Sequence, residues 1–177
     1  QSLYFKQLFA VLKKMGYEAP MIHLPYDFVT LPSGMMSSRS GNTVLFNDVY
    51  SECKNSFLAE TKARHEDWSV EKIDEVAEKL TMATLKFEMI KVSAEKIITF
   101  NIKEALRFEG YTAAYLQYSC ARINSVLAKA GEWIISTEAM HFTETAEKNL
   151  VVALAKYPEV IAEAASKYEP SILTQYL

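Results

Sequence analysis

Apolar residues recur at steps of three and four from Asp48 to the end of the chain, almost without interruption. This spacing places them along one side of an α-helix. Only 5 glycines and 5 prolines occur among the 177 residues, which disfavours a β fold with many tight turns. We therefore expect a mainly α-helical chain.

Caps and helix breakers predict where the helices begin and end. Asn47 or Asp48 is expected to cap one helix, and Ser69 a longer one, while Asn101 and Glu104 form a capping-box pair. Helices are expected over residues 2–15, 48–65, 70–90, 102–110, 111–130, 143–156, 158–168 and 170–177, with a break at Tyr157 and Pro158. Short strands or extended pieces are expected over residues 21–24, 28–31, 43–46 and 97–100.

The helix and short strands before residue 47 are typical of the end of an α/β domain. A parallel sheet needs several βαβ units, for which the sequence has no room there. We therefore expect the chain to begin within a domain. Its last residue, Leu177, stands in an uncapped apolar helical pattern, so a truncation is expected at that end as well.

Composition limits the classes of function. The net charge is −3, whereas a protein that coats nucleic acid is expected to be basic, so any RNA contact has to be a local patch. No long uncharged apolar run occurs, so no transmembrane helix is expected, and no signal peptide is expected before the first helix. A chain of this length can bury about 70% of its unfolded surface around one core. Cys53 and Cys120 lack a CxxC partner and are expected to be free, buried thiols in a reducing cytoplasm.

Residues 109–122, EGYTAAYLQYSCAR, hold the densest functional pattern. Tyr111, Tyr115, Tyr118 and Arg122 fall at spacings of four, three and four and share one side of the expected helix. A second, apolar stripe is expected to be buried and comprises Leu116, Ile123, Leu127 and Ala130. Tyrosines and an arginine can stack bases and hold phosphates. The alternative is that the tyrosines pack at the edge of the core, with their hydroxyls hydrogen-bonded nearby.

This segment resembles the EGxTxPYLQYxHAR motif that opens the helical anticodon-binding domain of arginyl-tRNA synthetases. The matching residues are Glu109, Gly110, Thr112, Tyr115, Leu116, Gln117, Tyr118, Ala121 and Arg122. Ala114 stands where that family usually has proline, and Cys120 where it usually has histidine.

A second motif lies in the loop of residues 34–42, GMMSSRSGN. Its glycines let the backbone approach a ligand, its serines supply donors, and Arg39 suits phosphate oxygens. The residues alone are equally consistent with a flexible surface loop, and no GK[ST] sequence makes it a P-loop.

This loop resembles the KMSKS loop of class I synthetases in its arginyl form, GKMSxRxGN, which closes over ATP. The resemblance implies catalytic roles for Ser37, Ser38 and Arg39, and nucleotide binding by Gly34, Met35, Met36, Ser37 and Arg39. Met35 and Ser40 stand where lysines are common, so Arg39 is the remaining cation.

The opening QSLYFKQLF resembles the family's QxxHFxQLF, with Tyr4 in place of histidine. The resemblance implies that Gln1 contacts the guanidinium of the substrate arginine; alternatively, Gln1 is a frayed first residue. His23 also stands at a family position, although a structural histidine is an equal alternative. His65 and His141 lack metal-ligand spacing, and no structural metal site is expected.

The resemblance covers the whole chain and implies a helical bundle of the synthetase anticodon-binding type, preceded by a small α/β remnant of a Rossmann-like catalytic domain. The implied division is residues 1–109, catalytic, and 110–177, anticodon-binding. No histidine lies in an HxGH pattern, so the HIGH half of the ATP site is expected outside the chain.

The implied function is that of a fragment of an arginine–tRNA ligase that uses ATP with Mg²⁺, arginine and an arginine-accepting tRNA. The resemblance implies a cytoplasmic protein, expected to be a monomer without a membrane partner, with Tyr118 and Arg122 contacting the tRNA. The isolated chain is expected to be inactive. The alternative is a synthetase-like RNA-binding or regulatory module that has lost catalysis, which Met35 and Ser40 would permit.

Overall fold

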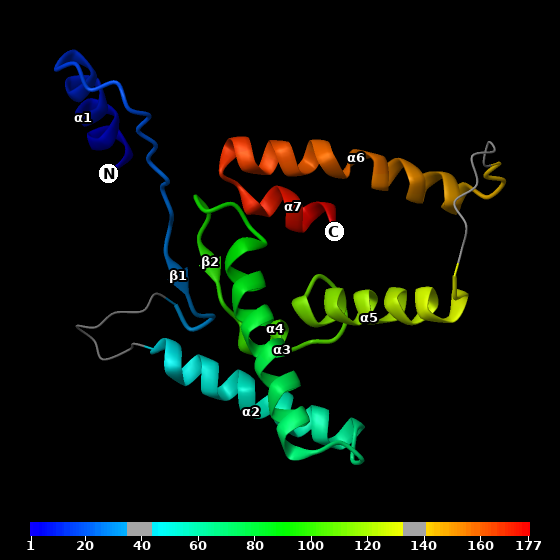
Figure 1. The fold of residues 1–177 in the computed structure, drawn as a ribbon. Coiled ribbons are helices and arrows are strands. Elements are labelled where there is room, and N and C mark those ends of the chain that lie inside the picture. The colour runs from blue at the N-terminus through cyan, green and yellow to red at the C-terminus, as the bar shows by residue number, and fades with distance from the viewer. Residues whose placement is uncertain (35–43, 133–140) are drawn as a thin grey trace.

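The structure is a computed structural model that describes residues 1–34, 44–132 and 141–177. Its helices are α1 (Ser2–Lys14), α2 (Phe46–Arg64), α3 (Val70–Ile90), α4 (Ile102–Ala105), α5 (Ala113–Ala130), α6 (Thr145–Lys167) and α7 (Pro170–Tyr176). Two short strands, β1 (Val29–Thr30) and β2 (Ile98–Thr99), complete the described elements. The chain is thus mainly α-helical, as expected, with a small α/β part near its N-terminal end (Figure 1).

The small α/β part is a two-stranded parallel sheet in which Val29 pairs with Ile98 and Thr30 with Thr99. The helices α2 and α3 form the crossover between the two strands (Figure 1). The buried cluster below the sheet consists of Cys53, Leu85, Phe100 and Ala105. It therefore joins α2, α3, β2 and α4 in one small core.

Polar contacts also tie α2 to α3. Lys54 Nζ lies 3.0 Å from a carboxylate oxygen of Asp74 and 3.2 Å from one of Glu78. The hydroxyl of Tyr50 donates a hydrogen bond to Glu78, which together with Lys54 lowers the pKa of that carboxyl group. These residues are partly exposed, so their ion pairs add little stability and serve mainly to set the register of the two helices.

The remaining helices form a second layer. The first turn of α5 packs on α3. The helices α6 and α7 form a helical hairpin, and α7 also contacts α3 (Figure 1). The Thr174 hydroxyl of α7 donates to the Ile90 carbonyl at 3.4 Å, which ties this hairpin to the end of α3. The helix α1 lies at the far end of an extended segment and buries no residue (Figure 1).

The predicted strands are only partly present. Residues 21–24 are not a strand, and the strand expected over 28–31 shortens to Val29–Thr30. In the third expected strand, residues 43–46, Thr43 lies outside the described residues. Val44 and Leu45 are not in a strand, and Phe46 begins α2. Apolar runs this short do not distinguish a strand from an extended connection, because pairing partners distant in sequence decide between them.

Two helix boundaries also differ from expectation. The N-cap of α2 is Leu45, and the Asp48 carboxylate accepts the Leu45 backbone N–H at 3.3 Å from within the first turn. The break expected at Tyr157 and Pro158 is wrong, because α6 continues through Pro158. By contrast, Ser69 caps α3 by accepting the Lys72 N–H at 3.3 Å, and Pro170 begins α7 as expected.

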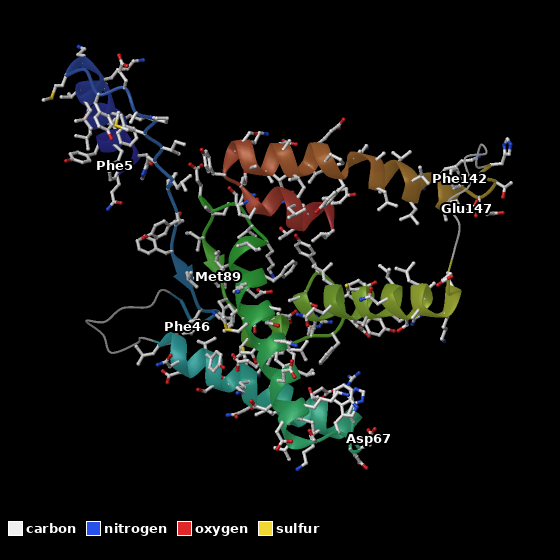
Figure 2. All side chains as sticks on the ribbon, in the orientation of Figure 1. Phe5, Phe46, Asp67, Met89, Phe142 and Glu147 are labelled. Carbon is white, nitrogen blue, oxygen red and sulfur yellow. The ribbon has the colours of Figure 1, made fainter. Side chains whose placement is uncertain are left out.

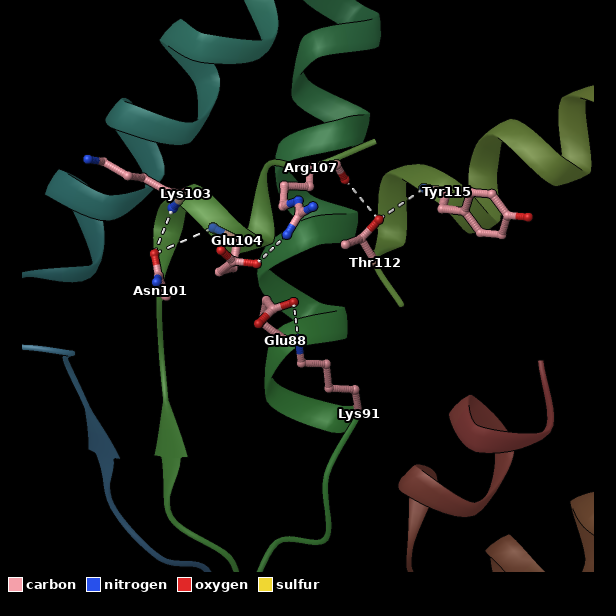
Figure 3. A network of polar contacts seen from close by, with 8 residues as sticks. All are labelled: Glu88, Lys91, Asn101, Lys103, Glu104, Arg107, Thr112 and Tyr115. Atoms are coloured by element: carbon pink, nitrogen blue, oxygen red, sulfur yellow. Dashed lines mark hydrogen bonds and ion pairs between the residues drawn. The ribbon is translucent and has the colours of Figure 1, made fainter. Parts of the chain in front are cut away.

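The capping box predicted at Asn101 is half formed. The Asn101 side chain accepts the backbone N–H groups of Lys103 and Glu104 at 3.1 and 3.4 Å. The Glu104 carboxylate instead pairs with Arg107 at 3.0 Å, so it does not reach back to the cap (Figure 3). The helix α4 ends at Ala105, well before the expected end at Gly110.

The chain buries less surface than its length predicts. It exposes 13904 Å², whereas a compact monomer of 20.1 kDa exposes about 8,700 Å². About half of the unfolded surface is therefore buried, and the expected 70% is wrong. Exposed apolar side chains occur on α1, α5 and α6, and Phe46 and Met89 line an apolar hollow of about 450 Å³ (Figure 2).

The two cysteines differ. Cys53 is fully buried, and burial raises the pKa of its thiol to about 11, so it stays protonated at neutral pH. Cys120 is free as well but exposed on α5, which corrects the expectation that both thiols are buried.

Candidate RNA-contact helix and nucleotide loop

The entrance to α5 is built from contacts within a few residues. Gly110 adopts a φ of +82°, which only glycine reaches without strain. The Thr112 hydroxyl donates to the Arg107 carbonyl at 2.9 Å and accepts the Tyr115 N–H at 3.3 Å (Figure 3). This single side chain closes the turn and caps the helix, which is why the direction of α5 follows from its local sequence.

The first turn of α5 is its buried part. Ala113 and Ala114 are 5% and 2% exposed and pack against α3. Ala114, which stands where the family motif usually has proline, thus lies in the first turn of the helix. A missing backbone N–H costs nothing there, and a small side chain fits. The turn joins α5 firmly to the rest of the chain.

The predicted aromatic stripe consists of three residues, and Tyr111 is not one of them. Tyr111 precedes the helix and places its ring edge-on against Phe87 of α3, with centroids 5.0 Å apart. Tyr115, Tyr118 and Arg122 lie on α5 and are exposed. Tyr111 therefore contacts α3 at the junction although it is 44% exposed, and it differs from the other three in preceding the helix.

Arg122 and Tyr118 act as a pair. The guanidinium donates a hydrogen bond to the Tyr118 hydroxyl at 2.8 Å and lies 5.7 Å from the ring centroid. This hydrogen bond raises the pKa of Arg122. The pair presents a fixed positive charge and an aromatic face beside each other at the surface.

The predicted burial of the second stripe on α5 is wrong for most of its length. Leu116 is half-buried, whereas Ile123 and Leu127 are 59% and 51% exposed and Ala130 is exposed. Beyond its first turns, α5 projects away from α3, so no described element covers this stripe (Figure 1). An apolar pattern predicts that a face is fit for burial, but the covering element has to come from elsewhere.

The loop of residues 34–42, which is expected to bind the nucleotide, lies mostly outside the described residues, and so do its predicted residues Met35, Met36, Ser37, Ser38 and Arg39. Its first residue, Gly34, exchanges backbone hydrogen bonds with Leu31 at 2.9 and 3.2 Å. Gly34 has a φ of +115°, so glycine is required there. The loop thus leaves from the carboxyl end of a parallel strand, where ligands bind in open α/β sheets.

His23 lies beside the first turn of α1, whose N-cap is Gln1. Gln1 is the exposed N-cap of α1, and its carbonyl accepts the Phe5 N–H at 3.1 Å. The His23 ring stacks on Phe5 at 4.5 Å and lies 3.4 Å from the Ser2 hydroxyl. His23 therefore holds the first turn of α1 against the extended segment, next to Gln1.

Two further observations bear on ligands and location. Among residues 1–34, 44–132 and 141–177, no three His, Cys, Asp or Glu side chains form a group that could hold a metal ion. Within the same residues, no helix is both long and apolar enough to cross a membrane.

Sequence reasoning missed an aromatic and cationic cluster at the turn between α2 and α3. His65, dismissed for want of metal-ligand spacing, stacks on Trp68 with centroids 3.8 Å apart. The ammonium group of Lys72 lies 3.9 Å from the Trp68 centroid. The sequence could have indicated this cluster, because residues 64–68 read RHEDW and Lys72 follows one helical turn after Trp68. These residues place cations and aromatic rings at one helix junction.

The sequence and the fold were compared with known proteins. Residues 1–101 match the family described as "tRNA synthetases class I (R), catalytic domain", and residues 116–177 match the "DALR anticodon binding domain". An arginine–tRNA ligase of Ligilactobacillus salivarius is 33% identical over 99% of this chain and 31% of its own length. One of Clostridium beijerinckii is 35% identical over 100% of this chain and 31% of its own length. The chain thus spans about a third of the length of these relatives.

Solved structures agree with these matches. The arginyl-tRNA synthetase of Thermus thermophilus superposes with a TM-score of 0.72 and 32% identity over 85% of this chain and 24% of its own. That of Plasmodium falciparum gives a TM-score of 0.75 over 99% of this chain and 30% of its own; at 21% identity it shows the fold alone. The family that matches residues 1–101 covers more than half of the chain. The chain therefore belongs to the arginyl (R) family of class I tRNA synthetases.

Proposed function

We propose that the gene product carrying these 177 residues is an arginine–tRNA ligase, which activates arginine with ATP and transfers it to tRNA in the cytoplasm. The observation that carries this proposal is the succession of the catalytic family over residues 1–101 and the anticodon-binding family over residues 116–177 in one chain. We place the domain boundary at the Thr112-capped turn, with residues 1–109 before it and 110–177 after it.

The loop of residues 34–42 is proposed to act in the activation step. An arginine carboxylate oxygen attacks the α-phosphorus of ATP, and pyrophosphate leaves. Negative charge then grows on the leaving phosphates, where serine hydroxyls and the Arg39 guanidinium can stabilise it. Ser37, Ser38 and Arg39 take this role, and Gly34, Met35 and Met36 bring the loop backbone over the nucleotide. Mg²⁺ would enter with ATP and neutralise part of the phosphate charge.

The substrate contacts follow from the same division. Gln1 would bind the guanidinium of arginine through its side-chain carbonyl oxygen, an acceptor exposed at the start of α1. Tyr118 and Arg122 would bind the tRNA, because their hydrogen-bonded pair offers an aromatic face and a cation to solvent. In the transfer step, a hydroxyl of the terminal tRNA ribose attacks the activated carbonyl, and AMP leaves.

A second candidate is an RNA-binding or regulatory module without catalysis. It is favoured by Met35 and Ser40, which stand where the arginyl form of the loop often carries lysine. With those charges missing, the loop holds Arg39 as its cation, and the stabilisation of pyrophosphate depends on that residue. The two candidates differ in whether ATP is consumed.

The test is aminoacylation by the purified gene product with ATP, radioactive arginine and an arginine-accepting tRNA. We expect formation of arginyl-tRNA. Arg39→Ala should lower kcat by about 100- to 1,000-fold with little change in the KM for arginine, because a preorganised charge on the transition state is lost.

The control is Arg107→Ala, which removes an exposed guanidinium that pairs with Glu104 outside the loop. It should leave kcat unchanged. Tight tRNA binding without arginyl-tRNA formation would support the regulatory module, and full activity of Arg39→Ala would remove the loop from the mechanism.

A further inference from the structure

A groove separates the α2–α3 turn from α5. It has a volume of about 280 Å³, and we call it the corner groove. Its floor and walls come from five segments: the end of α2, the turn itself, α3, the segment before α5, and α5. The aromatic and polar residues that line it include Arg64, His65, Trp68, Phe108, Gln117 and Tyr118. The groove therefore runs directly into the Tyr118–Arg122 pair.

Planar groups line this groove. The rings of His65 and Trp68 lie parallel, with an interplanar angle of 10°. The Arg64 guanidinium lies 4.7 Å from the centroid of Phe108. None of these planar side chains belongs to the buried cluster below the sheet, and His65, Trp68 and Phe108 are only half-buried. Their stacking thus leaves ring surface at the groove, which is how proteins receive unpaired nucleic-acid bases.

The cations near the groove differ in whether a carboxylate neutralises their charge. Arg64 makes an ion pair with Glu60 at 2.6 Å, so its charge is largely neutralised. Lys72 and Arg122 make no ion pair with any residue in the described parts of the chain. Because His65 occupies one face of the Trp68 ring at 3.8 Å, Lys72 at 3.9 Å lies over the other. A lysine side chain is flexible enough to move to a phosphate and leave that face to a base.

Acidic residues restrict the path of a polyanion. Glu66 and Asp67 are exposed in the same turn, and Asp67 lies at the outer tip of the corner (Figure 2). These carboxylates repel phosphates on the outside of the turn. A nucleic-acid backbone is therefore favoured along the inner side, between Lys72 and Arg122.

We propose that the corner groove is an RNA-binding site, at which an unpaired base of the tRNA stacks on the His65–Trp68 pair and flanking phosphates contact Lys72 and Arg122. This inference rests on the proposed function, because it takes tRNA as the RNA. It extends the RNA surface from α5 to the α2–α3 turn and adds three residues that neither motif contains. A single-stranded or bulged nucleotide is the class of ligand, since a paired base has no free face to stack.

The test measures binding of a fluorescently labelled, arginine-accepting tRNA transcript to the purified gene product by anisotropy at several salt concentrations. Trp68→Ala should weaken binding about 5- to 100-fold, because one base loses its stacking partner, and Trp68→Phe should stay within about threefold of wild type. Lys72→Gln should reduce the slope of log affinity against log salt by about one.

The matched control is Lys79→Gln, on the same helix. Lys79 pairs with Glu75 at 2.5 Å and does not line the groove, so the salt slope should not change. Thermal melting of every variant separates binding from folding. If Trp68→Ala melts early, the salt slope of Lys72→Gln still decides, because that variant leaves the Trp68 ring in place.

The outcomes separate this inference from the proposed function. If wild type forms arginyl-tRNA and all groove variants bind tRNA as wild type does, the groove inference is overturned while the function stands. If wild type does not bind tRNA, the proposed function is overturned, and the groove inference that rests on it is overturned as well. If a groove variant loses activity with unchanged tRNA binding and salt slope, the groove serves something other than RNA, such as a protein segment, and the inference is again overturned.

Discussion

The Arg122 guanidinium lies one helical turn beyond Tyr118 and donates its hydrogen bond to the phenol oxygen at 2.8 Å. Both side chains are exposed, so the bond contributes little to stability, as other surface pairs do. Its effect is instead to reduce the number of conformations that a long side chain samples. A preoriented cation loses less entropy on binding a phosphate, which makes this pair better suited to recognition than to folding.

We predict that Arg122→Ala weakens tRNA binding and lowers the salt slope by about one, with no change in melting temperature. Tyr118→Phe should have a smaller effect, since it keeps the ring and removes only the hydroxyl that orients the cation. Binding titrations and thermal melts of the same variants check this, with Arg107→Ala as the control. A lower melting temperature with normal binding would instead assign Arg122 a structural role.

At the scale of an element, α6 is the helix whose sequence and structure differ most. Pro158 lacks the N–H that would bond to the Leu154 carbonyl, and its ring crowds the preceding turn. The helix nevertheless runs for 23 residues, with left-handed Tyr168 at its C-cap. The helix α7 contacts the turn of α6 that precedes the proline. The Tyr176 hydroxyl donates to the Ala153 carbonyl at 2.5 Å, and the Tyr176 and Tyr157 ring centroids are 6.0 Å apart. Packing of the hairpin thus offsets the cost of the proline.

Pro158→Ala should raise the free energy of unfolding, by up to about 3 kcal/mol, because alanine restores the helical hydrogen bond. The matched control is Pro170→Ala at the first position of α7, where proline costs nothing and little change is expected. Thermal and urea unfolding measure both. Should Pro158→Ala destabilise the chain, the bend at the proline would be part of how α6 receives α7.

At the scale of the whole molecule, the surface is larger than a compact chain of this mass would expose. Ile123, Val126 and Leu127 on α5 are each more than half exposed, and so are Leu150, Val152 and Leu154 on α6. The three α5 residues lie at spacings of three and one and share a face, and an exposed apolar face of this kind usually marks a surface that meets another element. The relatives are about three times as long as this chain, but their lengths alone do not say which element lies on these faces.

The 177 residues by themselves should therefore bind the hydrophobic dye ANS while still folded. Replacing Ile123 and Leu127 together by glutamine should reduce the dye signal without lowering the melting temperature, because neither side chain is buried. The polar exchange Lys129→Gln on the same helix is the control. Dye binding that is absent, or unaffected by the double exchange, would show that the α5 face is covered in solution.

Local sequence determined the features that depend on neighbours within one or two turns. Ser69 predicted the start of α3 and Pro170 that of α7, because each helix start depends on a residue directly beside it. The two motifs identified the family for the same reason, since each is a short contiguous run of residues. The roles of the loop residues within it remain predictions.

Tertiary structure decided what depends on residues distant in the chain. Val29 became a strand only by pairing with Ile98, and residues 21–24, equally apolar, found no partner. The apolar stripe of α5 stayed exposed because α5 leaves α3 after its first turns, and the corner groove formed because the α2–α3 turn and α5 line it from two sides. A side-chain pattern states what a face can bury or bind, whereas the packing of distant elements decides what that face meets.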